Sequence, residues 1–228
     1  MEYLPKGITL QLCDGAFPLS TDSMLLAHFV KLRKNARVLD LGSGCGTLGL
    51  LLCAKDAGCS VTGLELSASA HDAAEENIRR NGLEPRLNSI CTDFRNLPSG
   101  FTGHFHCCVS NPPYFSGGPA SIATPLARRD DCCSPEELCR TAARALRYGG
   151  DFFLVHKPEK LAQLIACGAA AGLESKMLTL VRHKEGGPIT LILLQMRKGG
   201  KPGLQITEKC LFDSLGEPTA YYREVYHI

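Results

Sequence analysis

Residues Asn111, Pro112, Pro113 and Tyr114 form the segment whose residue types point most directly to chemistry. They follow an apolar stretch, residues 105–110, which has the composition of a buried strand. Two consecutive prolines fix φ and remove two backbone donors, so the segment is stiff and its carbonyls can accept hydrogen bonds. An asparagine oxygen and a proline carbonyl beside an aromatic ring suit a planar group that bears an NH2. The pattern indicates a transferase acting on an amine or amide nitrogen, although an ordinary Pro-Pro turn after a strand has the same sequence.

A glycine-rich turn follows the first strand that we predict in the main domain. This strand covers residues 37–41 and contains Asp40, and the glycines of the turn are Gly42, Gly44 and Gly46. Glycines let a ligand approach the backbone, and the N-terminus of the following helix favours a negative group. Because the glycine spacing also satisfies the dinucleotide fingerprint, a nicotinamide-dependent dehydrogenase stays an alternative if the Pro-Pro segment is only structural.

Acidic residues at the ends of the predicted strands help to distinguish a nicotinamide dinucleotide from other possible cofactors. Glu65 ends the second strand, where it can bind ribose hydroxyls of either ligand. The carboxylate of Asp40 would repel a pyrophosphate but attract an ammonium group. Asp93 follows the third strand and can accept from an adenine amine, while Phe94 packs on the ring. A ligand with an amino-acid end, a ribose and an adenine is S-adenosylmethionine, which these residues favour.

The elements that position these residues alternate between strand and helix from about residue 36 onward. The predicted strands cover residues 37–41, 60–65, 86–91, 105–110, 152–155, 177–181 and 189–196. The predicted helices between them cover residues 45–55, 67–78, 134–147 and 158–171. This alternation predicts a Rossmann-like α/β fold, with a mostly parallel seven-stranded sheet, helices on both faces and an antiparallel late strand.

The length of 228 residues suits one large α/β domain. We expect an N-terminal extension, residues 1–35, that packs on the core and contains a possible strand at 8–13 and a helix at 22–33. The main domain is expected over residues 36–198, and a polar C-terminal tail over residues 199–228.

Composition argues against several classes of protein. Apolar residues make up 44% and charged residues 21% of the chain, no apolar run approaches the length of a membrane span, and the N-terminus lacks a signal pattern. We therefore expect a cytoplasmic protein without membrane contact. The twelve cysteines include no Cys-x-x-Cys pair, which favours reduced thiols and argues against a metal site.

In order and spacing, these motifs resemble those of class I S-adenosylmethionine-dependent methyltransferases. More narrowly, the chain looks like the tRNA (adenine-N6)-methyltransferases that modify the adenine next to the anticodon of a valine tRNA. The similarity includes residues 21–22, 155–161 and 198–203. One departure is the run 127–130, which reads Ala-Arg-Arg-Asp where the family often has a run like Ala-Arg-His-Glu. The resemblance implies S-adenosylmethionine as cofactor and tRNA as partner, with no metal and no obligate protein partner.

The resemblance and the residue types together suggest roles for individual side chains. The Asn111 oxygen and the Pro112 carbonyl would accept the two N–H groups of the amine, with Asn111 also bordering the cofactor, and Tyr114 would stack on the base. The stretch 115–133 is expected to be mobile without substrate. The basic residues expected to contact tRNA are Arg128, Arg129, Arg182, Lys184 and Lys198.

Two other functions compete with this interpretation. A protein glutamine-N5-methyltransferase uses the same Asn-Pro-Pro-Tyr motif, but such enzymes resemble a methyltransferase domain preceded by a helical substrate domain. Here only 36 residues precede the first strand of the main domain. A catalytically silent module of the same fold has no physical need for Asp40, Glu65, Asp93 and Asn111 together.

Overall fold

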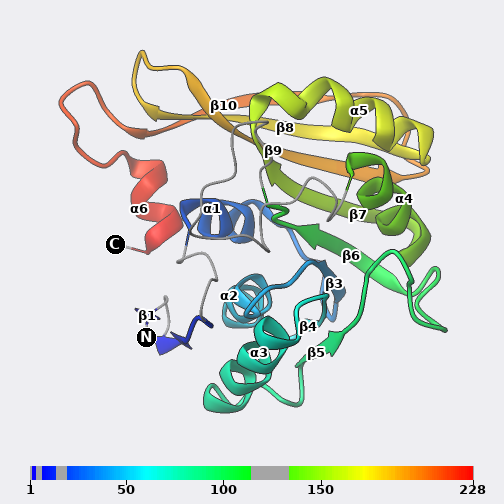
Figure 1. The fold of residues 1–228 in the computed structure, drawn as a ribbon. Coiled ribbons are helices and arrows are strands. Elements are labelled where there is room, and N and C mark those ends of the chain that lie inside the picture. The colour runs from blue at the N-terminus through cyan, green and yellow to red at the C-terminus, as the bar shows by residue number, and fades with distance from the viewer. Residues whose placement is uncertain (1, 4–6, 14–19, 114–133, 228) are drawn as a thin grey trace, which may run out of the picture.

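The computed structural model describes residues 2–3, 7–13, 20–113 and 134–227 (Figure 1). The expectations for Tyr114, for Arg128 and Arg129, and for the stretch 115–133 fall outside these ranges. Within the described ranges, no helix is long and apolar enough to cross a membrane. The ten cysteines found there are all free thiols.

The main sheet has eight strands in the order β10-β8-β9-β7-β6-β3-β4-β5. Their bounds are β3 (Arg37–Leu41), β4 (Ser60–Glu65), β5 (Leu87–Cys91), β6 (Phe105–Ser110), β7 (Leu146–His156), β8 (Leu173–Lys184), β9 (Ile189–Lys198) and β10 (Gln205–Phe212). Strand β9 runs antiparallel to both of its neighbours, and every other pair in this sheet is parallel. The predicted fold class is confirmed, and all seven predicted strands are present.

The eighth strand, β10, lies within the residues for which the sequence predicted a polar tail. It pairs in parallel with β8 at the edge of the sheet. Of its side chains, only Leu211 is buried, while Ile206 is 61% exposed. An edge strand with one buried residue leaves almost no alternation of apolar and polar residues, which is the signal that predicts a strand.

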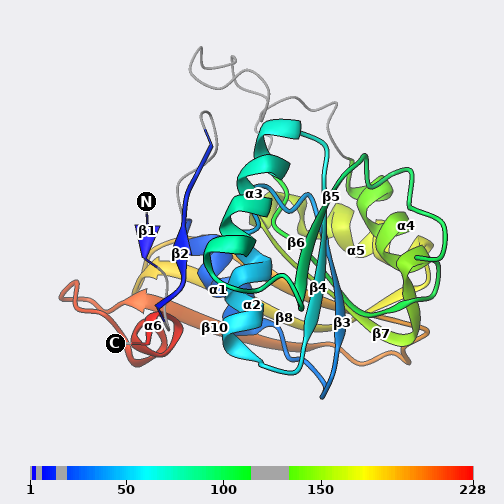
Figure 2. The same cartoon turned by 90° about the horizontal axis from the view of Figure 1, so that it is seen from below.

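Helices cover both faces of the sheet, as Figures 1 and 2 show. The helices are α1 (Thr21–Phe29), α2 (Thr47–Lys55), α3 (Ala68–Arg80), α4 (Pro135–Ala145), α5 (Leu161–Ala170), which follows the 3-10 turn η3 (Pro158–Lys160), and α6 (Ala220–Tyr226). Helices α1, α2 and α3 lie on one face, and α4 and α5 lie on the other. Each face has its own buried cluster of apolar side chains.

Local sequence signals set where two of these helices begin. The Ser134 hydroxyl accepts from the Glu137 amide, and the Glu137 carboxylate accepts from the Ser134 amide, which is the reciprocal capping box predicted from the sequence. Pro135 occupies the first position of α4, where its missing donor costs nothing. The Ser67 hydroxyl caps α3 in the same way by accepting from the Ala70 amide.

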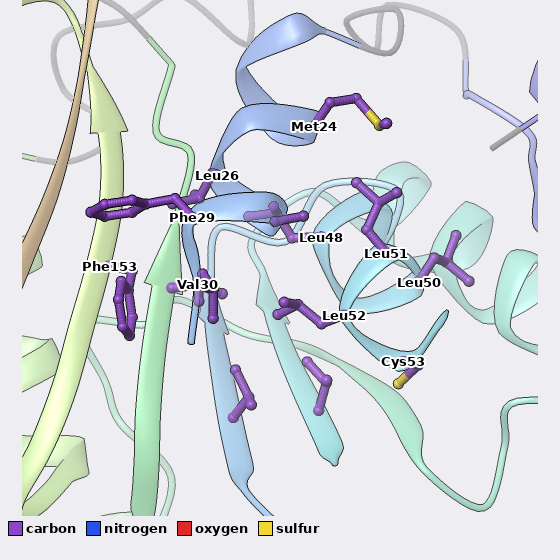
Figure 3. Packing of buried hydrophobic residues seen from close by; sticks show 14 of the residues in the cluster. Met24, Leu26, Phe29, Val30, Leu48, Leu50, Leu51, Leu52, Cys53 and Phe153 are labelled. Atoms are coloured by element: carbon purple, nitrogen blue, oxygen red, sulfur yellow. The ribbon is translucent and has the colours of Figure 1, made fainter. Parts of the chain in front are cut away.

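Helix α1 is part of the core, although it precedes the main domain in the chain. Figure 3 shows its side chains packed beside those of α2 and against β7. Phe29 of α1 meets Phe153 of β7 edge to face, with ring centroids 5.7 Å apart. This packing holds the first turn of α1 close to the ends of the central strands.

The segment before α1 forms a small second sheet. Strands β1 (Glu2–Tyr3) and β2 (Thr9–Leu10) pair with each other in antiparallel fashion. Strand β2 is shorter than the predicted strand 8–13, because residues around it bond to side chains of α3 instead of to a neighbouring strand.

Candidate active site

The predicted cofactor residues and Asn111 lie along the edge of the sheet at which the parallel strands have their carboxyl ends. From β3 the chain continues to β4 and β5 on one side, and later to β6 and β7 on the other. Ligands of open α/β sheets bind at the edge where this order reverses, here between β3 and β6. The buried Ser110 hydroxyl joins the two strands there by donating to the Leu41 carbonyl at 2.7 Å.

The glycine turn after β3 is held in shape by the end of β4. Amides of Gly42 and Ser43 donate to the Leu64 carbonyl at 2.9 and 3.1 Å. The Gly44 amide donates to one carboxylate oxygen of Glu65 at 2.8 Å, and the other oxygen accepts from the Ser67 amide at the same distance. Each carboxylate oxygen has further acceptor capacity, so Glu65 can still bind hydroxyl groups.

Gly46 and Gly63 are the positions where this turn most requires glycine. Gly46 has φ +85°, a left-handed conformation that strains other residues, and it begins α2. At Gly63, a Cβ atom would lie 2.5 Å from the Ser43 hydroxyl. The absence of a side chain at Gly63 therefore leaves room for the side chain of Ser43, which belongs to the turn.

Asp40 is the most unusual group of the site. Its carboxylate is 1% exposed, and neither oxygen has a hydrogen-bond partner in the described part of the chain. Burial, together with the nearby charge of Glu65, raises the pKa of Asp40 to about 8. The Ser43 hydroxyl beside it is also buried without a partner among the described residues. Burial of polar atoms without hydrogen-bond partners costs free energy unless a ligand supplies the missing donors. The ammonium group of S-adenosylmethionine is a positively charged donor of this kind.

The structure places Asp93 two residues after β5 and gives it a strong partner. The Arg95 guanidinium contacts both carboxylate oxygens, with Nε 3.0 Å from Oδ1 and 2.8 Å from Oδ2. These bonds lower the pKa of Asp93, so that it remains a charged acceptor. Arg95 also lies 3.7 Å from Glu137 of α4. The side chain of Phe94 is partly buried against the cluster on the α4 face.

Asn111 follows β6 directly and is oriented by a residue that the sequence did not indicate. Its Nδ2 atom donates to the hydroxyl of Ser23, in the first turn of α1, at 3.0 Å. This bond uses the nitrogen end of the carboxamide and so fixes the direction of the Oδ1 acceptor. Pro112 is buried behind it. Ser23 directly follows Thr21 and Asp22, a pair that the chain shares with the family it resembles, and this position was the one available signal.

The basic residues do not all lie at this edge. Arg182 and Lys184 are near the end of β8, which lies at the site edge because β8 and β7 are both antiparallel to β9. Arg182 pairs with Glu208 of β10. Lys198 ends β9 at the opposite edge, where its amine donates to the Leu146 carbonyl at 2.7 Å. Lys157, which the sequence did not single out, directly follows β7 and is exposed at the site edge.

This sheet order, with a glycine turn at the switch point and acidic residues after successive strands, defines a class I S-adenosylmethionine-dependent methyltransferase. A solved structure with this fold is that of a protein from Agrobacterium tumefaciens described as a predicted O-methyltransferase. The TM-score is 0.75 and the identity 23%, and the match covers 91% of this chain and 96% of that one. This likeness shows the fold alone.

Residues 19–165 match the family model of the methyltransferase small domain, and the chain belongs to that family. A curated relative, the tRNA1(Val) (adenine(37)-N6)-methyltransferase of Tolumonas auensis, is 32% identical over 186 residues, which are 80% of this chain and 77% of the relative. The protein of the same name from Photobacterium profundum is 29% identical over 225 residues and 92% of each chain.

Proposed function

We propose that this protein transfers a methyl group from S-adenosylmethionine to the exocyclic N6 of an adenine in tRNA. The observation that carries the proposal is the Asn111 carboxamide, oriented by Ser23 and placed at the end of β6, next to the strand that carries the buried Asp40. The names of the curated relatives support tRNA as the substrate and the adenine next to the anticodon of a valine tRNA as the target. A tRNA substrate also supports the cytoplasmic location expected from the sequence.

The proposed role of the Asn-Pro-Pro segment is to activate a weak nucleophile. The lone pair of an adenine amine is delocalised into the ring, so the nitrogen reacts poorly. Acceptance of one N–H by Asn111 Oδ1 and the other by the Pro112 carbonyl would favour a pyramidal nitrogen. When bound, S-adenosylmethionine supplies a methyl group already activated by the positive sulfur. Holding the amine in a near-attack position can supply about 7–11 kcal/mol of the acceleration.

The target adenine must leave the stack of the anticodon loop to reach this segment, as in other enzymes that modify bases. Tyr114, next in the chain, is the proposed stacking partner, with an expected contribution of about 1–3 kcal/mol. Of the residues proposed to hold the cofactor, Asp40 would bind the ammonium group, Glu65 the ribose, and Asp93 the adenine amine.

The function is tested by following a labelled methyl group. The protein is incubated with labelled S-adenosylmethionine and unmodified bulk tRNA, and the RNA is digested to nucleosides. We expect the label in N6-methyladenosine. A parallel incubation with a cell protein extract in place of tRNA tests the glutamine-N5 alternative, and label in that protein fraction, as methylated glutamine, would support it. Absence of label from both fractions, with cofactor binding intact, would support the silent module.

The basic residues at the site edge give a prediction about tRNA binding. Lys157 and Lys184 are both exposed: Lys157 follows β7, the neighbour of the strand that leads to Asn111, and Lys184 ends β8, two strands beyond β7 at the same end of the sheet. If each contacts a phosphate, replacing each by alanine should reduce the slope of log affinity against log salt by about one unit. The slope is measured by titrating tRNA at several salt concentrations.

The matched control for this titration is Lys34→Ala, since Lys34 is an exposed lysine just before β3, at the opposite edge. Its slope should equal that of the unmodified protein. Equal slopes for all three variants would remove Lys157 and Lys184 from the tRNA surface. Arg128 and Arg129, outside the described residues, stay proposed contacts that the same titration can test.

A further inference from the structure

Asn77 of α3 is a buried polar residue that links the N-terminal segment to the glycine turn. Its side chain is completely buried and makes three hydrogen bonds. The Nδ2 atom donates to the Cys45 carbonyl at 3.0 Å and to the Gln11 carbonyl at 2.8 Å. The Oδ1 atom accepts from the Gln11 amide at 2.8 Å. One carboxamide therefore joins two backbone segments that are more than 30 residues apart in the chain.

We call residues 8–13 the N-terminal strap. Two asparagine side chains at the C-terminal end of α3 form hydrogen bonds with its backbone. Asn81, one turn after Asn77, accepts from the Thr9 amide at 2.9 Å and donates to the Thr9 carbonyl at 2.8 Å. The two asparagines thus give the strap hydrogen-bond partners in addition to its neighbouring strand β1. They differ in one respect, because only Asn77 also bonds to the glycine turn.

The hydrogen bond from Asn77 to the Cys45 carbonyl lies where the glycine turn leads into α2. The peptide between Cys45 and Gly46 precedes the first residue of α2, and Gly46 has the left-handed conformation already described. Helix α3 is also close here, since a Cβ atom at Gly46 would lie 3.4 Å from the Cβ atom of Ala74. Rotation of the Cys45 carbonyl would break its bond to Asn77 and leave a buried donor without its partner, which is unfavourable.

We propose that Asn77 is a positioning residue for S-adenosylmethionine. It fixes the orientation of the Cys45 carbonyl, and with it the shape of the glycine turn that receives the cofactor. The same carboxamide also bonds to the N-terminal strap, but the orientation of the Cys45 carbonyl depends on Asn77 itself. The proposal rests on the cofactor and not on the identity of the methyl acceptor, so it can fail while the tRNA activity holds.

The test compares Asn77→Ala with Asn81→Ala. We expect Asn77→Ala to raise the Kd for S-adenosylmethionine, measured by calorimetry, by about tenfold, as for the loss of one buried hydrogen bond. The KM for the cofactor should rise in parallel, while kcat at saturating cofactor stays close to that of the unmodified protein. Asn81→Ala removes the contacts with Thr9 of the strap and the 2.7 Å bond from Asn81 Nδ2 to the Asn77 backbone carbonyl, but no contact with the glycine turn, and its Kd should stay nearly unchanged.

A thiol pair reports whether the strap is docked in each variant. The sulfur atoms of Cys13 and Cys45 lie 3.6 Å apart. Mild treatment with hydrogen peroxide, which is reduced to water as two thiols form a disulfide, should link them in the unmodified protein. Peptide mapping then shows whether Asn81→Ala loosens the strap, which establishes it as a control.

Two outcomes would overturn the proposal. One is an unchanged Kd in folded Asn77→Ala, and the other is an equal rise in Kd for both asparagine variants, which would mean that the helix acts on the cofactor only through the strap. If Asn77→Ala does not fold, Asn77→Asp is the second variant, because aspartate has nearly the same shape and keeps the acceptor for the Gln11 amide but lacks the donor to the Cys45 carbonyl. An unchanged Kd in Asn77→Asp would then reject the proposal.

Discussion

Replacement of Asn111 by alanine is expected to lower the rate of adenine methylation by about 10²–10³-fold, the usual cost of losing one hydrogen-bonding group aimed at the reacting atoms. The side chain is oriented by Ser23 and follows the end of β6, beside the strand that carries Asp40. The lost acceptor acts on the substrate amine, so the Kd for S-adenosylmethionine should change much less than the rate. Single-turnover reactions with saturating cofactor measure the chemical step directly.

Ser23→Ala is the matched variant for this experiment. It keeps the Asn111 acceptor and removes the 3.0 Å bond that orients it, together with a 3.4 Å contact between the hydroxyls of Ser20 and Ser23. We expect a rate about tenfold below that of the unmodified protein, corresponding to one lost hydrogen bond. A folded Asn111→Ala variant that methylates tRNA at the normal rate would show that the Pro-Pro segment is only a structural turn.

Asp40→Asn should weaken cofactor binding strongly, because it removes the buried carboxyl group proposed to bind the ammonium group of the cofactor. The loss of a hydrogen bond to a charged group corresponds to roughly a hundredfold increase in Kd. Calorimetric titration of both proteins with S-adenosylmethionine at pH 8 measures this directly. Similar Kd values for the two proteins would mean that Asp40 does not bind the ammonium group.

The same variant should also be more stable than the unmodified protein at pH 8. The pKa of Asp40 is raised from the ordinary 3.8 to about 8 by burial and by Glu65, so the folded state holds a proton that the unfolded chain releases. The stability contributed by protonated Asp40 is complete below about pH 3.8 and is lost as the pH rises to about 8. Asparagine is neutral throughout and avoids this loss.

We therefore expect the free energy of unfolding of Asp40→Asn to exceed that of the unmodified protein by a few kcal/mol at pH 8, about 1.4 kcal/mol for each pH unit between the two pKa values. The difference should shrink as the pH falls toward 4. Urea unfolding at pH 5 and at pH 8, without cofactor, measures both values. A difference that is the same at the two pH values would contradict the shifted titration of Asp40.

Several features of the site were predictable because their signals are local in sequence. Glu65 ends a recognisable strand, and in a parallel sheet all strand ends lie at one edge. Asp93 follows another such end. The capping box of Ser134 and Glu137 likewise depends on residues three positions apart. The order of strands and turns was therefore enough to place these groups together.

Other features were missed because their partners are distant in the chain. Ser23 bonds to Asn111 across 88 residues, and Asn77 reaches Gln11 across 66. The sequence around them gives no reason to expect distant partners, because serine is common in the first turn of a helix and asparagine is common on its exposed face. Only the packing of α1 and α3 against the strand ends shows what these two side chains contact.

Residue types and their spacing were enough to predict the strands along the chain, the glycine turn, the acidic residues at the strand ends and the Asn-Pro-Pro segment. These depend on periodicity and on residue type, which are read within a few positions of the chain. The burial of Asp40 without a partner among the described residues, the end of the sheet at which each basic residue lies, and the eighth strand became visible only in the folded structure. Burial, charge and strand pairing result from contacts between distant segments, because desolvation depends on everything that surrounds a group in space.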